Sequence, residues 1–126
     1  MWRFYDYLKP NGRNDIAQWT RSFNKERRTK LRAKVDIVRR IGIDAPTEIL
    51  ADLGGGIYKL KIKGKPQLRP LLCLGVLDND NEFTFLIGAE EENGKLVPRD
   101  AVKRARERRA ELLADPSRRT EHEEID

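Results

Sequence analysis

Apolar residues recur with two different periods in the first third of the chain. Between Trp2 and Tyr7 aromatic and polar residues alternate, which is typical of a β-strand, and the turn residues Pro10-Asn11-Gly12 end this segment. The next apolar residues are spaced by three and four, the period of an amphipathic helix: Ile16, Trp19, Phe23, Leu31, Val35, Val38 and Ile41. We predict a helix hairpin, because Asn14 and Asn24 can each cap a helix and Gly42 can end the second one.

The middle of the chain returns to the two-residue period of strands. Residues 57–63 alternate strictly, with Ile57 and three lysines on one face and three apolar residues on the other. Residues 68–76 are more continuously apolar and predict a central strand. Residues 82–89 predict a third strand, which follows a hairpin turn at Asp78-Asn79-Asp80-Asn81. Residues 43–56, with Pro46 and three consecutive glycines, predict a connection rather than a core element.

The C-terminal third combines a polar loop, a helix and a polar end. After the predicted loop from Glu90 to Pro98, Pro98 can start a last helix. Its apolar side carries Val102, Ala105, Leu112 and Leu113, and its basic side carries Lys103, Arg104, Arg106, Arg108 and Arg109. We expect an α+β fold at residues 1–113, in which an N-terminal strand and a helix hairpin pack on a small antiparallel sheet with a C-terminal helix. Residues 114–126 are predicted to be a disordered tail.

Composition agrees with one folded domain and adds a charge bias. The chain has 126 residues, of which 37% are charged and 38% hydrophobic, and its mean hydropathy is −0.74. This length leaves little room for two cores. The net charge of +5 and the isoelectric point near 9.5 favour polyanionic partners such as nucleic acid.

Several functional classes can be set aside. Cys73 is the only cysteine, which excludes an intramolecular disulfide and a cysteine-rich zinc site. His122 is the only histidine and falls in the predicted tail, so neither a metal site nor a serine hydrolase is expected. No cofactor is expected, because Gly54-Gly55-Gly56 lacks the strand and helix context of a phosphate-binding loop. No apolar run reaches the ~20 residues of a membrane span and no signal peptide is evident, so we expect a cytoplasmic protein.

The most unusual feature is a cationic hairpin without any acidic residue between Tyr58 and Arg69. Its cations are Lys59, Lys61, Lys63, Lys65 and Arg69. Such neighbours repel one another unless an anion lies among them, which indicates RNA binding through these five residues. The alternative is an edge strand that lysines protect from aggregation.

The sequence resembles the bacterial RelE, HigB and ParE toxin superfamily, most closely its HigB-like, phage-associated branch. Residues 56–62 (GIYKLKI) resemble the family strand G-(I/L)-(Y/W)-E-L-R-I, and residues 68–72 (LRPLL) resemble the strand Y-R-V-L-Y. Residues 98–108 fit the helix pattern P-x-x-E-I-x-x-A-x-x-R. The resemblance extends over about residues 2 to 113 and implies a RelE-like fold.

The resemblance implies the toxin of a type II toxin–antitoxin system. Such a toxin is an endoribonuclease that cuts messenger RNA, usually at the ribosome, and an antitoxin, here expected to be of helix-turn-helix type, silences it. The ribose 2′-hydroxyl attacks the adjacent phosphate and leaves a 2′,3′-cyclic phosphate. This reaction needs a base, positive charge for the phosphorane, and an acid for the leaving 5′-oxygen.

The family motifs suggest roles for individual residues. Lys61 and Arg69 occupy the two arginine positions of the strands, and Arg69 would bridge phosphate oxygens as a planar fork. Lys59 and Lys63 share the face of Lys61, and a lysine crowded by cations can lose its proton more easily and act as the base. The candidate catalytic set is therefore Lys61, Arg69, Lys59 and Glu90.

The sequence departs from the family in three places. Residues 88–92 (GAEEE) replace the common F-x-K-K, Ala101 replaces a glutamate before the last helix, and Lys59 replaces a glutamate. Either Glu90 or Glu91 supplies a carboxylate acid or base, or the catalytic end of the site has been lost. The alternatives are a non-catalytic ParE-like gyrase inhibitor and a degenerate phage accessory protein that only binds an antitoxin.

The outer face of the second predicted helix is also basic. It carries Lys25, Arg27, Arg28, Lys30, Arg32, Lys34, Arg39 and Arg40. This face is a solvated surface, a docking face or an RNA contact. We expect the part from Arg28 to Arg40, or the last helix, to dock an acidic segment of the antitoxin.

Overall fold

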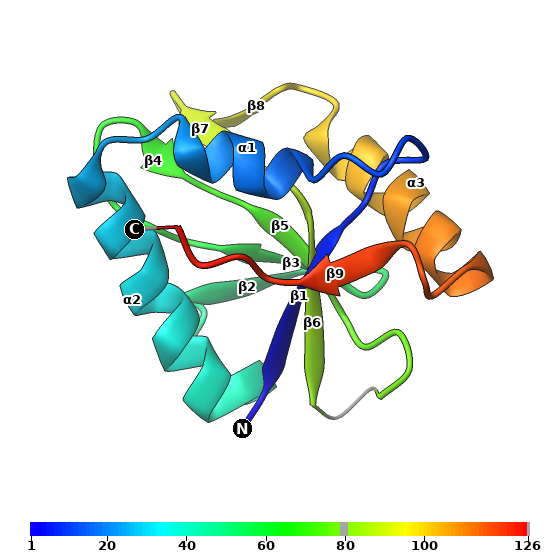
Figure 1. The fold of residues 1–126 in the computed structure, drawn as a ribbon. Coiled ribbons are helices and arrows are strands. Elements are labelled where there is room, and N and C mark those ends of the chain that lie inside the picture. The colour runs from blue at the N-terminus through cyan, green and yellow to red at the C-terminus, as the bar shows by residue number, and fades with distance from the viewer. Residues whose placement is uncertain (79–80, 126) are drawn as a thin grey trace.

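The computed structural model describes residues 1–78 and 81–125, and in these residues three α-helices pack on a six-stranded sheet that is accompanied by a three-stranded sheet (Figure 1). The elements follow in chain order as β1 (Arg3–Tyr7), α1 (Asp15–Arg21), α2 (Lys25–Ile41), a 3-10 turn η1 (Gly42–Asp44), β2 (Leu50–Gly54), β3 (Ile57–Leu60), β4 (Gln67–Leu68), β5 (Leu71–Leu74), β6 (Glu82–Ile87), β7 (Glu90–Glu92), β8 (Lys95–Val97), α3 (Ala101–Ala114) and β9 (Arg119–Glu121).

The six-stranded sheet has the order β2-β3-β5-β6-β1-β9. Its strands pair antiparallel except for β1 and β6, which are parallel with Phe4 opposite Phe83. One face packs on α2, where Leu31, Val35 and Val38 meet the sheet, and the other packs on α3. The short β4, β7 and β8 form the second sheet. The predicted α+β class is confirmed.

The predicted helix boundaries of the hairpin are confirmed where local chemistry decides them. The side chains of Asn14 and Asn24 accept hydrogen bonds from Ala17 N and Arg27 N, so each caps its helix. Gly42 follows α2 at a φ of 71°, and a Cβ there would lie 2.0 Å from Nε1 of Trp2. Only glycine fits this position.

The alternation in the lysine-rich segment is also confirmed. Tyr58, Leu60 and Ile62 belong to the core on the α2 side, whereas Ile57 belongs to the core on the α3 side. Of the predicted central strand at 68–76, only β5 lies centrally, between β3 and β6, whereas Leu68 belongs to β4 of the second sheet. The predicted turn at 78–81 falls partly outside the described residues, since it includes Asn79 and Asp80.

Two segments expected to be irregular are strands. Residues 50–54, within the predicted connection, form β2, because Leu50 and Ala51 are buried where they pair with β3. The predicted loop from Glu90 to Pro98 holds the β7–β8 hairpin, which turns at Asn93-Gly94 with φ values of 51° and 76°. An Asn-Gly pair is a strong hairpin signal that the composition of this loop concealed.

The last helix differs from its prediction at its start and on one face. It begins at Ala101, three residues after Pro98. Arg108, expected on the basic side, is buried, and its guanidinium donates to Leu86 O at 2.8 Å and to Asp15 Oδ2 at 3.2 Å. The arginine is tolerated inside because these acceptors satisfy its charge and its donors.

The prediction of a disordered C-terminal tail is wrong for residues 119–125. Arg119–Glu121 form β9, which pairs antiparallel with β1. The side chain of His122 is only 6% exposed and lies against Asp6. The polar composition that indicated disorder is here compensated by tertiary partners on β1, α1 and α2.

Glu82 anchors β9 from two strands away. Its carboxylate is 2% exposed and accepts hydrogen bonds from Leu77 N at 3.0 Å, Asp78 N at 2.7 Å and Arg119 Nη2 at 3.0 Å. Burial by itself disfavours the charged form, but these donors outweigh it and hold the pKa of Glu82 below its ordinary value of 4.5.

This lowered pKa predicts a pH dependence of stability. A carboxylate with a depressed pKa contributes stability above its unfolded pKa and loses it as the pH falls through the folded value. We therefore expect the free energy of unfolding of the wild type to fall more steeply below about pH 4.5 than that of Glu82→Gln. Urea titrations at several pH values measure this difference. Parallel curves for the two proteins would show that Glu82 is not linked to folding.

No helix in the described part of the chain has the length and apolar character needed to cross a bilayer.

Candidate functional site

Two of the predicted site residues converge on the carboxylate of Glu91, which the sequence analysis named only as the alternative to Glu90. Lys59 Nζ lies 3.3 Å from Glu91 Oε1, and Arg69 Nε lies 3.7 Å from the same oxygen. Lys59 comes from β3, Arg69 follows β4, and Glu91 belongs to β7, which pairs with β4. The expectation that these cations lack an acidic partner is therefore wrong, because the β7–β8 hairpin brings Glu91 over them.

Arg69 is enclosed, and both terminal nitrogens of its guanidinium are engaged, whereas its buried Nε has no hydrogen-bond partner in the described residues. Its side chain is 7% exposed, and Nη1 donates to Ile62 O at 3.1 Å and to Leu68 O at 2.9 Å, while Nη2 donates to Gln67 Oε1. These bonds tie the chain after β3 to β4. The arginine therefore holds the turn that carries Lys63 and Lys65, and it does not present a free fork to a phosphate.

Glu90 and Glu91 are separated by the alternation of β7. Glu90 pairs with Leu68 and Val97, whereas Glu91 pairs with Gln67 and Leu96 and reaches the two cations. Neighbouring residues of a strand point to opposite faces. The structure thus places Glu91, and not the predicted Glu90, beside Lys59 and Arg69.

The remaining lysines of the predicted set form no ion pair with any residue that the structure describes. Lys61 follows β3, and Lys63 and Lys65 flank Gly64 in the turn before β4. This turn lies against the N-terminal part of α2, where the Arg27 guanidinium donates to Lys65 O. Three cations of the hairpin are therefore available to an anion, whereas Lys59 and Arg69 are not.

A hollow of about 220 Å³ lies between this turn and α2. A second hollow of about 260 Å³ adjoins it and shares Lys30, Ile62 and Lys63. Together they form what we term the basic groove, whose cations are Arg27, Lys30, Lys34, Lys63 and Lys65. Its one acidic residue in the described lining is Glu26, which is 3.4 Å from Lys30.

The two walls of the basic groove follow from local sequence. Asn24 sets the start of α2, and Arg27, Lys30 and Lys34 then follow at spacings of three and four, which places them along one helix stripe. The other wall is the Lys63-Gly64-Lys65 turn, which Arg69 stabilises through its hydrogen bond to Ile62 O. Sequence reasoning found both basic segments but not their apposition, because the contact joins residues far apart along the chain.

The groove offers binding groups but no evident base. His122 lies elsewhere, at the seam of β1 and β9, with Nδ1 2.8 Å from Asp6 Oδ1. Burial raises the pKa of the Cys73 thiol to about 11, so this buried thiol is not a nucleophile near neutral pH. Among the described residues no three His, Cys, Asp or Glu side chains are grouped to hold a metal ion.

No family model matches this chain, and neither a curated protein nor a solved structure matches it. The resemblance to RelE and HigB toxins therefore stands on the three short motifs alone.

Proposed function

We propose that this protein binds single-stranded RNA in the basic groove and acts as a RelE/HigB-like toxin that cuts messenger RNA. The observation that carries the proposal is the apposition of cations from α2 and from the Lys63–Lys65 turn around one hollow. Cations along a groove bind a phosphate backbone and release its condensed counterions. The cutting reaction rests on the family resemblance.

Within this proposal Lys61 is a better candidate than Arg69 for the charge that stabilises the phosphorane. Lys61 occupies the arginine position of the first motif and has no ion pair in the described residues, whereas Arg69 is occupied by carbonyl oxygens. The 2′-oxygen bonds to phosphorus, the bond to the 5′-oxygen breaks, and the proton lost from the 2′-hydroxyl is balanced by one gained at the 5′-oxygen. Groove lysines would hold the flanking phosphates.

A second candidate is an RNA binder that does not cut. The contacts of Glu91 favour it, because this carboxylate neutralises Lys59 and Arg69, two of the four residues of the predicted catalytic set. Binding through the basic groove would be the same in both candidates. They differ only in whether a phosphodiester bond breaks.

Induction of the chain followed by primer extension across a reporter transcript separates these functions. We expect growth arrest and new 5′ ends within codons, which Lys61→Ala reduces about 100-fold or more if the charge stabilises the transition state. RNA binding without new ends would select the second candidate. DNA-damage signs without RNA cuts would select a gyrase inhibitor, and absence of both binding and toxicity would contradict the proposal.

The toxin proposal also implies an antitoxin. We propose that a neighbouring gene encodes a small helix-turn-helix protein that forms a complex with this chain. Gel filtration of the two proteins at micromolar concentration tests the complex directly.

A further inference from the structure

The C-terminal residues 119–125, which we term the strap, cross the seam between β1 and the two N-terminal helices (Figure 1). The strap begins as β9, paired antiparallel with β1. The pairing continues where His122 N donates to Phe4 O at 2.9 Å. The strap is thus an added edge strand of the six-stranded sheet.

Two side chains anchor the strap: Arg119 pairs with the buried Glu82, and His122 packs in the core. The His122 ring lies 5.0 Å from the Phe85 ring, and its Nδ1 lies 2.8 Å from Asp6 Oδ1. The second oxygen of Asp6 accepts from Asn14 Nδ2 at 3.0 Å and from Glu123 N at 3.3 Å. Asp6 therefore joins the strap to β1 and to the cap of α1.

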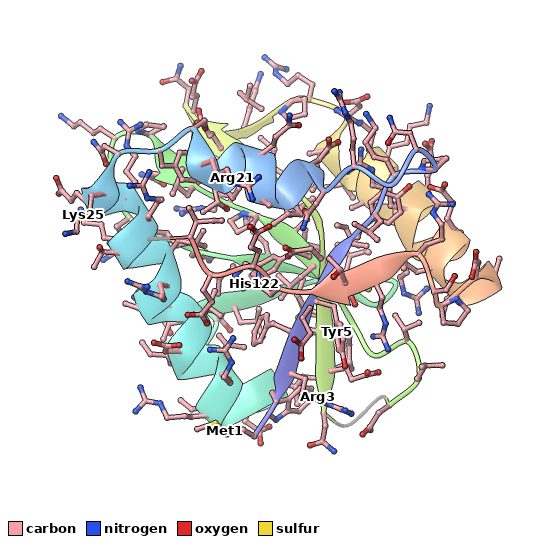
Figure 2. All side chains as sticks on the ribbon, viewed as in Figure 1. Met1, Arg3, Tyr5, Arg21, Lys25 and His122 are labelled. Carbon is pink, nitrogen blue, oxygen red and sulfur yellow. The ribbon has the colours of Figure 1, made fainter. Side chains whose placement is uncertain are left out.

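Acidic residues of the strap pair with arginines of both helices. Glu123 pairs with Arg21 of α1, and Glu124 pairs with Arg39 of α2 at 2.9 Å. In Figure 2 the labelled His122 lies near the centre of the view, with Arg21 labelled on the helix above it. These pairs are partly exposed and so contribute little stability each, but they show which charge this surface accepts.

The surface beneath the strap keeps an unsatisfied donor. Arg28 Nε is sealed from solvent and has no hydrogen-bond partner within the described residues. Arg28 lines a small hollow together with Leu31, Val35 and His122, directly under the strap. Buried donors are normally paired, so Arg28 keeps one donor beneath the strap that an added ligand group would satisfy.

The strap has the features of a segment that opens locally. Its strand is three residues long and lies at a sheet edge, and its two largely buried side chains, Arg119 and His122, are both polar. Segments with few buried contacts open at a fraction of the free energy of global unfolding. Opening exposes the backbone of β1 as an edge, flanked by Arg21, Arg28 and Arg39, and such an edge pairs readily with another strand.

We propose that this surface is a docking site for an acidic extended segment of a partner protein, which adds as a strand to β1, and that the strap occupies the site until the partner displaces it. Backbone pairing supplies the affinity of such strand addition, and charge supplies the selectivity. The site is lined by other residues than the basic groove, so the proposal does not depend on RNA binding.

The strap sequence itself is the probe that tests the site. A fluorescent peptide of residues 117–126 is titrated into the full chain and into Glu123→Lys/Glu124→Lys. Both glutamates are exposed, so folding is retained, and the reversed charges weaken the strap against Arg21 and Arg39. We expect the peptide to bind this variant at least tenfold more tightly than the wild type, whose tethered strap competes at a high effective concentration.

A matched control carries the same change of charge elsewhere. In Glu48→Lys/Glu107→Lys both sites are exposed and far from the strap in sequence, so we expect the peptide to bind as weakly as it does to the wild type. Adding Arg21→Ala and Arg39→Ala to Glu123→Lys/Glu124→Lys, the strap variant, should return the affinity for the peptide to the wild-type level.

Three results would overturn the proposal. The first is absence of peptide binding to a strap variant whose thermal melt matches the wild type. The second is equal binding to the strap variant and to the matched control. The third is a strand-exchanged dimer by light scattering, because a second copy of this chain would then be the occupant.

Discussion

Replacing Arg69 by alanine should lower the free energy of unfolding by about 3 kcal/mol, because the substitution removes the four polar contacts of an enclosed side chain. The carbonyls of Ile62 and Leu68 each lose one of their two donors, and Glu91 loses one of its two cations. A solvent-exposed phosphate-binding arginine would cost almost nothing when removed. Urea denaturation followed by circular dichroism measures the change.

Two variants complete this test. Lys61→Ala should leave the free energy of unfolding within about 0.5 kcal/mol of the wild type, because Lys61 has no ion pair in the described residues. Arg69→Lys should fall between wild type and alanine, because a lysine keeps the charge near Glu91 but cannot serve two carbonyls with a planar fork. If Arg69→Ala is as stable as the wild type but fails to cut RNA, the family's arginine role applies to Arg69 after all.

Binding of single-stranded RNA should weaken about 100-fold between ~50 and ~200 mM salt. Each phosphate neutralised on a single strand contributes about −0.7 to the slope of log affinity against log salt. Five contacts by the cations of the basic groove give a slope of about −3.5, hence about 100-fold for a fourfold change in salt. Fluorescence anisotropy with a short labelled RNA measures it.

Removal of charges from the basic groove should change the slope of log affinity against log salt concentration, as well as the affinity itself. In Lys63→Ala/Lys65→Ala we expect the slope to become shallower by about 1.4, because two phosphate contacts are lost. The matched control, Lys95→Ala/Lys103→Ala, changes the net charge equally at exposed sites on β8 and α3 and should leave the slope unchanged. Equal effects of the two variants would mean that RNA, if bound at all, is held by diffuse charge.

Local rules determined a large part of this fold. Asn14 and Asn24 cap their helices because a short polar side chain before a helix can accept from its first free N–H groups. Residues 57–63 divide between the two faces of the sheet because side chains alternate in any strand. Gly42 ends α2 because glycine adopts a φ of 71° without the strain that most other residues would have there. Each of these depends on residues only a few positions apart.

The candidate site could be predicted only in part. The sequence showed that Lys61, Lys63 and Lys65 alternate along a basic segment, and the structure places the latter two on the basic groove. The sequence did not show that Arg69 is enclosed, because whether a cation is exposed or buried depends on which distant groups pack over it. Glu91 reaches Arg69 only through the β7–β8 hairpin, whose Asn93-Gly94 turn lies in a segment that its polar composition predicts to be a loop.

The C-terminal strap shows most clearly what the tertiary structure alone decided. By composition, residues 119–125 are too polar to bury apolar surface of their own, which predicts disorder. In the fold the edge of β1 offers backbone partners, Asp6 offers a buried acceptor for His122, and Arg21 and Arg39 offer opposite charges. Sequence patterns specify elements with local causes, whereas pairing across more than a hundred residues depends on where those elements pack.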